Sequence, residues 1–117
     1  MDFILNTFSE NVVQLILQIP YGRVSTYGAI AAQAGNNRGA RLVSYILHSS
    51  TQKYQLPWHR IVGKGGFIKI SDPIGQNVQR DLLQSEGIVI NQNAIVDFEI
   101  IEWTQWKKSF LLVDENY

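Results

Sequence analysis

Two short helical patterns separated by a three-residue turn constrain the fold of this chain more than any other feature. The first pattern follows Ser25, which is a candidate N-cap, and stops at Gly35. Asn36 and Asn37 then cap a second helix, which we expect to run from about Arg38 to His48. Two helices joined by so short a turn have helix-turn-helix spacing.

The segments on either side of this pair complete the predicted fold. Thr7 and Glu10 stand at capping-box spacing before an apolar helical pattern, and Pro20 ends that helix. Residues 60–70 read as two strands around a glycine loop at 63–66, which predicts a β-hairpin. A hairpin in that position is the wing of a winged helix. We therefore predict a mainly helical α+β fold, a winged helix-turn-helix typical of DNA-binding domains.

The last third of the chain is expected to close this fold. A helix from about Gln76 to Ser85 has Gly87 as its C-cap. Its inward side chains are predicted to be Val78, Leu82 and Leu83. Residues 98–103 could form a strand. The side chains expected to pack a closing turn on the core are Trp106, Phe110 and Leu111. The length of 117 residues fits one domain over 1–117, with 88–117 as an extension packed on it.

A net charge of zero conceals a segregation of charge. No acidic residue lies between Asn11 and Ser71, whereas that stretch holds the basic residues Arg23, Arg38, Arg41, Lys53, Arg60, Lys64 and Lys69. The side chains of the predicted second helix separate into an apolar face and a polar, basic face. One face gathers Leu42, Val43, Ile46 and Leu47, and the other gathers Arg38, Arg41, Ser44, Tyr45 and His48. This indicates a cationic surface for a polyanion such as nucleic acid. A solvated surface helix is the alternative.

Composition excludes several classes of chemistry. The chain has no cysteine, so it has no disulfide, no thiolate metal site and no thiol nucleophile. Its two histidines stand without clustered carboxylates, and we expect neither a metal site nor a cofactor. No apolar run reaches the roughly 20 residues of a membrane span. The first twenty residues lack the features of a signal peptide, so we expect a cytoplasmic protein, nucleoid-associated if bacterial.

Five motifs resemble a known family when they are taken together. They are Ile19–Gly28 (IPYGRVSTYG), Ala34–Asn36 (AGN), Ala40–Val43 (ARLV), Pro57–Val62 (PWHRIV) and Glu86–Gly87. Their order and spacing are similar to the C-terminal domain of the O6-alkylguanine-DNA alkyltransferases, from about Val12 to Gly87. In those enzymes a cysteine stands where this chain has Trp58. The chain therefore resembles the alkyltransferase-like proteins, which bind alkylated guanine in double-stranded DNA and signal to nucleotide excision repair.

The residue at position 58 decides what chemistry the resemblance allows. Alkyl transfer needs a strong nucleophile such as a thiolate. The Trp58 indole is neutral, offers only an N–H donor and has no lone pair free to attack. It can add apolar surface to a pocket that receives an alkyl group. A purely structural role as a core aromatic is the alternative. We thus expect a non-catalytic protein that recognises DNA damage.

The resemblance also implies roles in DNA binding. The O6 substituent is inspected by flipping the nucleotide out of the duplex. Tyr27 is expected to rotate the phosphate 3′ to the flipped base, and Arg41 to enter the stack in its place. The helix is expected in the minor groove, where small residues allow close approach. The expected DNA-binding residues are Thr26, Tyr27, Arg38, Gly39, Ala40, Arg41 and Ser44. Alternatively, Tyr27 is a capping aromatic and Arg41 an ordinary phosphate contact.

The lesion pocket follows from the same resemblance. Its expected residues are Pro57, Trp58, His59, Arg60 and Ile61, with Lys69 or Ser71 in place of the binding-loop tyrosine of the transferases. His59 and Glu86 match the partners that activate cysteine, and here they are expected to remain as a structural hydrogen-bonded pair. The chain departs from the transferases at Ser44-Tyr45, where they have Gly-Gly, and at Ser50, which aligns with their hinge asparagine. The family suggests a monomer.

Three other functions stay open at this point. The first is a winged-helix transcription regulator that reads sequence through the major groove. The second is a diverged alkyltransferase with another acceptor, such as His59 or Lys64. The third is an interaction module whose exposed aromatic residues Trp103, Trp106 and Phe110 bind a partner.

Overall fold

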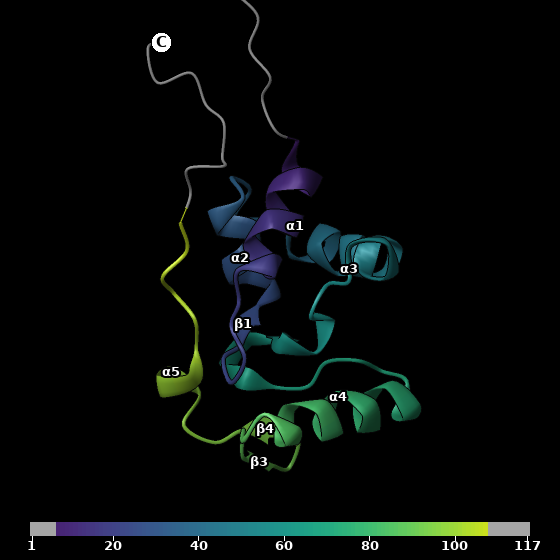
Figure 1. Ribbon diagram of the computed structural model, residues 1–117, viewed down its shortest axis with the longest axis vertical. Helices are drawn as coiled ribbons and strands as arrows, with labels where there is room; N and C mark the ends of the chain where they lie inside the picture. The colour runs from purple at the N-terminus through teal and green to yellow at the C-terminus, as the bar shows by residue number, and fades with distance from the viewer. Residues whose placement is uncertain (1–6, 108–117) are drawn as a thin grey trace, which may run out of the picture.

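The computed structural model describes residues 7–107, in which three helices form one end of the molecule, and a fourth long helix with several short elements forms the other (Figure 1). The first helix, α1 (Phe8–Leu17), begins with the predicted capping box. The Thr7 hydroxyl accepts a hydrogen bond from the Glu10 amide at 3.1 Å, and the Glu10 carboxylate accepts one from the Thr7 amide at 2.8 Å. The helix stops before Pro20, so both predicted ends are confirmed.

The predicted helix pair is α2 (Tyr27–Gln33) and α3 (Ala40–Tyr54), but the N-cap of α2 is Thr26, not Ser25. The Thr26 hydroxyl accepts a hydrogen bond from the Ala29 amide at 3.0 Å. Ser25 is fully buried in the short strand β1 (Ser25–Thr26) instead. The N-cap is the last non-helical residue before a helix, and the strand extends through Thr26, so the cap moves one residue along.

Helix α3 begins two residues later and ends six residues later than predicted. It begins late because the Asn36 side chain accepts a hydrogen bond from the Arg38 amide at 3.0 Å and holds that residue in the turn. It ends only where Gln55 takes a left-handed conformation. Val43, Ile46 and Leu47 are buried as predicted, whereas Leu42 is exposed, so that assignment is wrong.

A short parallel strand pair joins the two ends of the molecule. Strand β1 pairs with β2 (Ile61–Val62), with Ser25 opposite Ile61, and a 3-10 turn, η1 (Trp58–Arg60), precedes β2. The predicted wing hairpin over 60–70 is therefore wrong in extent. Only a single bridge, between Gly63 and Phe67, closes the glycine loop, since the residues before it pair with β1 and Phe67 also bridges to Ala94.

Helix α4 (Pro73–Ser85) starts three residues before its predicted beginning, because Asp72 caps it by accepting a hydrogen bond from the Gly75 amide at 3.1 Å. Its end is as predicted. Gly87 has a positive φ of 84°, and the Ile88 amide donates to the Leu83 carbonyl at 3.2 Å, which is a Schellman motif.

The inward face of α4 differs from the prediction. Leu83 is fully buried, but Val78 and Leu82 are exposed, so their inward assignment is wrong. Gln79 takes the buried position, because its side-chain amide donates to the His59 carbonyl at 3.1 Å and to the Ile61 carbonyl at 2.8 Å. These carbonyls need a partner when buried, so a polar side chain is favoured there over an apolar one.

Residues after α4 form a second, smaller core. Strands β3 (Ile90–Asn91) and β4 (Ala94–Ile95) form an antiparallel hairpin, and Gln92 and Asn93 in its turn both have positive φ. The next element is the short helix α5 (Phe98–Ile101), so the strand considered for 98–103 is wrong. The buried members of this core are Val24, Val62, Leu83, Ile88 and Ile95.

From α5 the chain returns along the side of α1 (Figure 1). The Trp106 indole donates to the Leu15 carbonyl at 2.9 Å, and Trp103 and Trp106 are both partly buried against the first core. The interaction-module hypothesis is therefore wrong about their exposure. Phe110 and Leu111 lie outside the described residues. Between residues 7 and 107, no helix is long and apolar enough to cross a membrane, and no three histidine, aspartate or glutamate side chains converge on a metal site.

Candidate nucleic-acid interface

Two adjoining cavities lie beside α3, on the side that faces the start of α2 and residues 69–71. The first has a volume of about 360 Å³ and is lined by Tyr27, Ser44, Leu47, His48, Thr51, Trp58 and Ile70. The second, of about 530 Å³, is lined by Tyr27, Ala40, Arg41, Ser44, His48, Lys69, Ile70 and Ser71. The two share four residues, so together they form one depression along the helix.

Several lining residues of the first cavity come from α3 and are regularly spaced along it. Ser44, Leu47 and Thr51 lie three and four residues apart, which places them on one side of an α-helix. The predicted helix ended at His48, so Thr51 was missed as a cavity residue, and Leu47 was assigned to the apolar core face. His48, which lines both cavities, was also missed as a site residue. Ile70 was also missed, because it follows a glycine loop with no regular period.

Trp58 is one of the residues that line the first cavity. It opens the turn η1, where its amide donates to the Leu56 carbonyl at 2.8 Å, and its ring packs partly against the first core. The remainder of the ring faces the cavity. Trp58 thus has both the structural and the lining role, and the apolar indole surface suits an alkyl substituent.

Tyr27 is shared by both cavities and is positioned by the cap before it. It is the first residue of α2, and the cap bond is made by the Thr26 hydroxyl, so Tyr27 is not the capping group. Burial raises the pKa of the Tyr27 phenol above its ordinary value. The phenol therefore stays protonated at neutral pH and can donate a hydrogen bond to a phosphate oxygen.

The second cavity brings positive charge to the depression. Arg41 and Lys69 line it together, whereas Arg38 is exposed beyond its edge. Among the described residues that line the two cavities, none is acidic. Gly39 is buried under α1, where an added Cβ would come within 2.7 Å of the Phe8 ring. The surface around Ala40 and Ser44 is therefore cationic with small side chains, which suits the approach of a nucleic-acid backbone.

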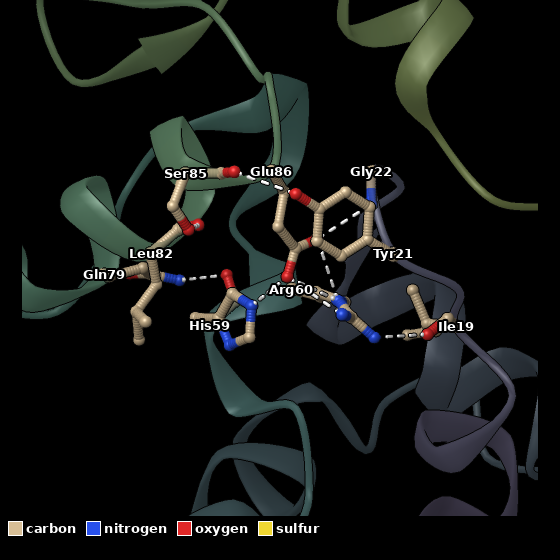
Figure 2. Close-up of polar contacts among 9 residues, drawn as sticks. All are labelled: Ile19, Tyr21, Gly22, His59, Arg60, Gln79, Leu82, Ser85 and Glu86. Carbon is tan, nitrogen blue, oxygen red and sulfur yellow. Dashed lines mark hydrogen bonds and ion pairs between the residues drawn. The ribbon is translucent and has the colours of Figure 1, made fainter.

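His59 and Arg60 line neither cavity, and both side chains contact Glu86 (Figure 2). His59 Nε2 lies 2.6 Å from Glu86 Oε2, and Arg60 Nε and Nη2 donate to the same carboxylate at 3.0 and 2.9 Å. The Gly22 amide donates to Glu86 Oε1 at 2.7 Å, and Arg60 Nη1 donates to the Ile19 carbonyl at 2.9 Å. This cluster, residues 19, 22, 59, 60 and 86, ties the turn after α1 to η1 and to the end of α4.

The charge state of Glu86 follows from these contacts. Burial alone raises the pKa of its carboxyl group, but hydrogen bonds from Arg60, the Gly22 amide and His59 outweigh burial, so the pKa lies below its ordinary value. Glu86 is therefore ionised at neutral pH. An ionised carboxylate with this many donors holds His59 and Arg60 in place.

The predicted pocket residues thus separate into two groups. Trp58, Lys69 and Ser71 line the cavities. Pro57, His59, Arg60 and Ile61 are not among the lining residues, and Ile61 is fully buried in the core. The 3-10 turn points the side chains of Trp58, His59 and Arg60 about 120° apart, so His59 and Arg60 leave the side of the turn on which Trp58 lines the cavity.

Comparison with known proteins identifies the family. The model of the 6-O-methylguanine DNA methyltransferase DNA-binding domain matches residues 7–88. The chain belongs to this family. Within it, the chain is 36% identical over 98 residues to the DNA base-flipping protein of Escherichia coli K12, covering 84% of this chain and 75% of that protein. It is 33% identical over 97 residues to alkyltransferase-like protein 1 of Schizosaccharomyces pombe, covering 82% and 90%.

Solved structures agree with this relationship. The crystal structure of S. pombe Atl1 in complex with damaged DNA containing O6-carboxymethylguanine matches with a TM-score of 0.75 and 32% identity, over 84% of this chain and 95% of that one. The Mycobacterium tuberculosis O6-methylguanine methyltransferase matches with a TM-score of 0.55 and 28% identity, over 57% of its length. The mainly helical α+β fold and the alkyltransferase-like assignment are confirmed, and this member of the family has no cysteine to accept an alkyl group.

Proposed function

We propose that this alkyltransferase-like protein binds O6-alkylguanine in duplex DNA and does not remove the alkyl group. The observation that carries the proposal is that Trp58 lines a cavity of about 360 Å³. That volume lies within the range of about 300–1,000 Å³ typical of ligand pockets. The indole stands where the transferases carry their acceptor cysteine, so the cavity can hold an alkyl group but offers no thiolate to accept it. Support comes from the relatives, one named a base-flipping protein and another crystallised on alkylated DNA.

Binding in this cavity requires the nucleotide to leave the helix, at a cost of a few kcal/mol that is smaller where alkylation has weakened the pair. Tyr27 lies on the wall of both cavities, where it can press on the 3′ phosphate. Arg41, at the edge of the second cavity, can occupy the vacated place in the stack. Ala40 and Ser44 allow α3 to approach the minor groove, while Thr26 and Arg38 contact the DNA beside it. Gly39, expected from the sequence to face the DNA, is buried against the Phe8 ring instead.

Alternative acceptors for an alkyl group are poorly placed for transfer. His59 is engaged with Glu86 at 2.6 Å and does not line either cavity. Lys64 lies in the glycine loop η2 (Lys64–Gly66), also outside the lining. A bound lesion would therefore persist unrepaired on this protein. We extend the proposal to an intracellular monomer, acting as one domain, that hands the marked site to nucleotide excision repair proteins.

A titration of two matched duplexes tests this function. One carries O6-methylguanine and the other guanine at the same position, at a fixed salt concentration. We expect at least about tenfold tighter binding to the alkylated duplex. Equal affinity would favour an ordinary winged-helix regulator. A duplex with a radiolabelled methyl group should leave no label on the protein, and transferred label would favour a diverged transferase.

A further inference from the structure

Helix α3 presents two different flanks on either side of Arg41. At about 100° per residue, Ser44 lies about 60° from Arg41 in one direction and Tyr45 about 40° in the other. The cavity residues Leu47 and Thr51 lie farther round on the Ser44 side. The lesion cavity therefore adjoins one flank of the helix, and the flank that carries Tyr45 faces away from it.

Tyr45 is a large aromatic side chain without a role in the lesion cavity. Its exposed fraction is 69%, and it lines neither cavity. The transferases that the chain resembles typically have glycine at this position, so the ring is a feature of this chain. A tyrosine combines a rigid apolar ring with a polar tip, which suits a half-polar binding surface. Tyr45 lies one turn beyond Arg41 on the cationic face of α3, so the binding partner that suits it is nucleic acid.

We infer that Tyr45 is a specificity-determining residue that contacts the undamaged strand. This inference rests on the proposed docking of α3 in the minor groove. That groove is only about 6 Å wide and is bounded by one backbone of each strand. An α-helix with its side chains is about 10–12 Å across, so its two flanks meet different strands. The flipped base enters the cavity flank from the lesion strand, which leaves the Tyr45 flank for the complementary strand.

Helix geometry sets where along the duplex this contact falls. Tyr45 lies four residues beyond Arg41, a rise of about 6 Å at 1.5 Å per residue. Successive nucleotides in one strand are about 3.4 Å apart, so Tyr45 meets the complementary strand about two base pairs from the vacated position. In the minor groove an A·T pair offers only acceptors, whereas a G·C pair adds the guanine amino group. The Tyr45 hydroxyl can donate a hydrogen bond to the acceptors of an A·T pair. The affinity for DNA should therefore depend on whether the pair two positions from the lesion is A·T or G·C.

The test uses O6-methylguanine duplexes that have A·T or G·C two pairs from the lesion, on one side or the other. The wild type is expected to bind one A·T duplex at least about threefold more tightly than its G·C counterpart. Tyr45→Phe keeps the ring but removes the hydroxyl and should abolish this preference. Tyr45→Ala should weaken binding to every lesion duplex at least about fivefold, because the contact area of the ring and its hydrogen bond are lost together. Tyr54→Ala, at the far end of α3, is the matched control and should change neither the A·T preference nor the affinity for lesion duplexes.

Photo-crosslinking identifies the strand that Tyr45 touches. Tyr45 is replaced by the photoreactive p-benzoylphenylalanine, each strand of the lesion duplex is labelled in turn, and the crosslinked strand is identified on a denaturing gel. Crosslinks between position 45 and the complementary strand alone are expected. Crosslinks from the lesion strand, or an unchanged affinity of a folded Tyr45→Ala variant, overturn the inference while the preference for alkylated duplexes stands. Equal affinity of the wild type for alkylated and unmodified duplexes overturns the proposed function and this inference together.

Discussion

Replacing Glu86 by alanine tests the cluster that holds the turn η1 in place. The Glu86 side chain is only 5% exposed, and Arg60, its principal cationic partner, is 16% exposed. The variant leaves the Arg60 cation and the Gly22 amide without the acceptor they share. Breaking a buried ion pair on one side costs about 3–5 kcal/mol. We expect about 3 kcal/mol, because Arg60 keeps its 2.9 Å hydrogen bond to the Ile19 carbonyl.

Urea denaturation at pH 7 and 25 °C measures this loss as a difference in the free energy of unfolding. A loss of about 3 kcal/mol corresponds to a fall in Tm of about 10 °C or more in a domain of this size. Glu86→Gln is the matched variant, because it keeps an oxygen that can accept from the Gly22 amide but removes the charge. Its loss should be smaller than that of Glu86→Ala.

The same variants have a defined pH dependence. The pKa of Glu86 in the folded protein lies below its ordinary value of 4.5, since the hydrogen bonds from Arg60, Gly22 and His59 outweigh the effect of burial. A lowered pKa means that the ionised group stabilises the fold above the unfolded-state pKa and loses this effect as the pH falls through the folded-state pKa. The gap between wild type and Glu86→Gln should therefore shrink below pH 4.5. Two results would refute the reasoning. One is a loss of under about 1 kcal/mol for Glu86→Ala at pH 7, and the other is a difference between wild type and Glu86→Gln that is unchanged at pH 3.

Other variants examine the interface itself. Arg41→Ala should weaken binding to an O6-methylguanine duplex at least about tenfold in a fluorescence titration, because a gap then remains in the stack; unchanged affinity would contradict the finger role. Tyr27→Ala should abolish the fluorescence rise of a base analogue at the lesion position, whereas a full signal would show that flipping does not need it. Trp58→Cys should transfer no label from alkylated DNA, since a thiol also needs the right orientation and pocket shape; stoichiometric transfer would show a latent enzyme. Gly39→Ala should lower stability by about 1 kcal/mol, because its Cβ would meet the tip of the Phe8 ring at 2.7 Å and the Asn36 carbonyl oxygen at 3.2 Å; an unchanged Tm would mean that the Phe8 side chain swings aside.

Features encoded within a few consecutive residues were predictable from the sequence. The capping box of Thr7 and Glu10 and the positive φ of Gly87 need only neighbouring backbone groups, so their spacing identified them. The motif set likewise placed Trp58 in the lesion pocket, and the structure puts it on a cavity wall. Of the other proposed site residues, those that line a cavity are Tyr27, Ala40, Arg41, Ser44, Lys69 and Ser71.

Features that depend on distant partners were not predictable. The periodicity of α4 predicted Val78 and Leu82 to be inward, but the neighbouring segment presents the carbonyls of His59 and Ile61, and Gln79 turns inward to meet them. Hydrophobic periodicity contains no information on such unpaired carbonyls, which exist only once the chain is folded. The position of Ile70 on the cavity wall was unpredictable for a similar reason. Ile70 follows a glycine loop, which has no hydrophobic period to indicate where the side chain points.

The sequence by itself determined the family, the helix pair and the absence of a thiol nucleophile, because each depends on residue identity and short-range spacing. The tertiary structure alone decided which face of the PWHR turn meets the cavity. In that turn, Trp58 lines the first cavity, while His59 and Arg60 turn toward Glu86, 27 and 26 residues farther along the chain. The physical reason is that a buried carboxylate must be paired, and its partners are chosen by which segments fold against it rather than by which are adjacent in sequence.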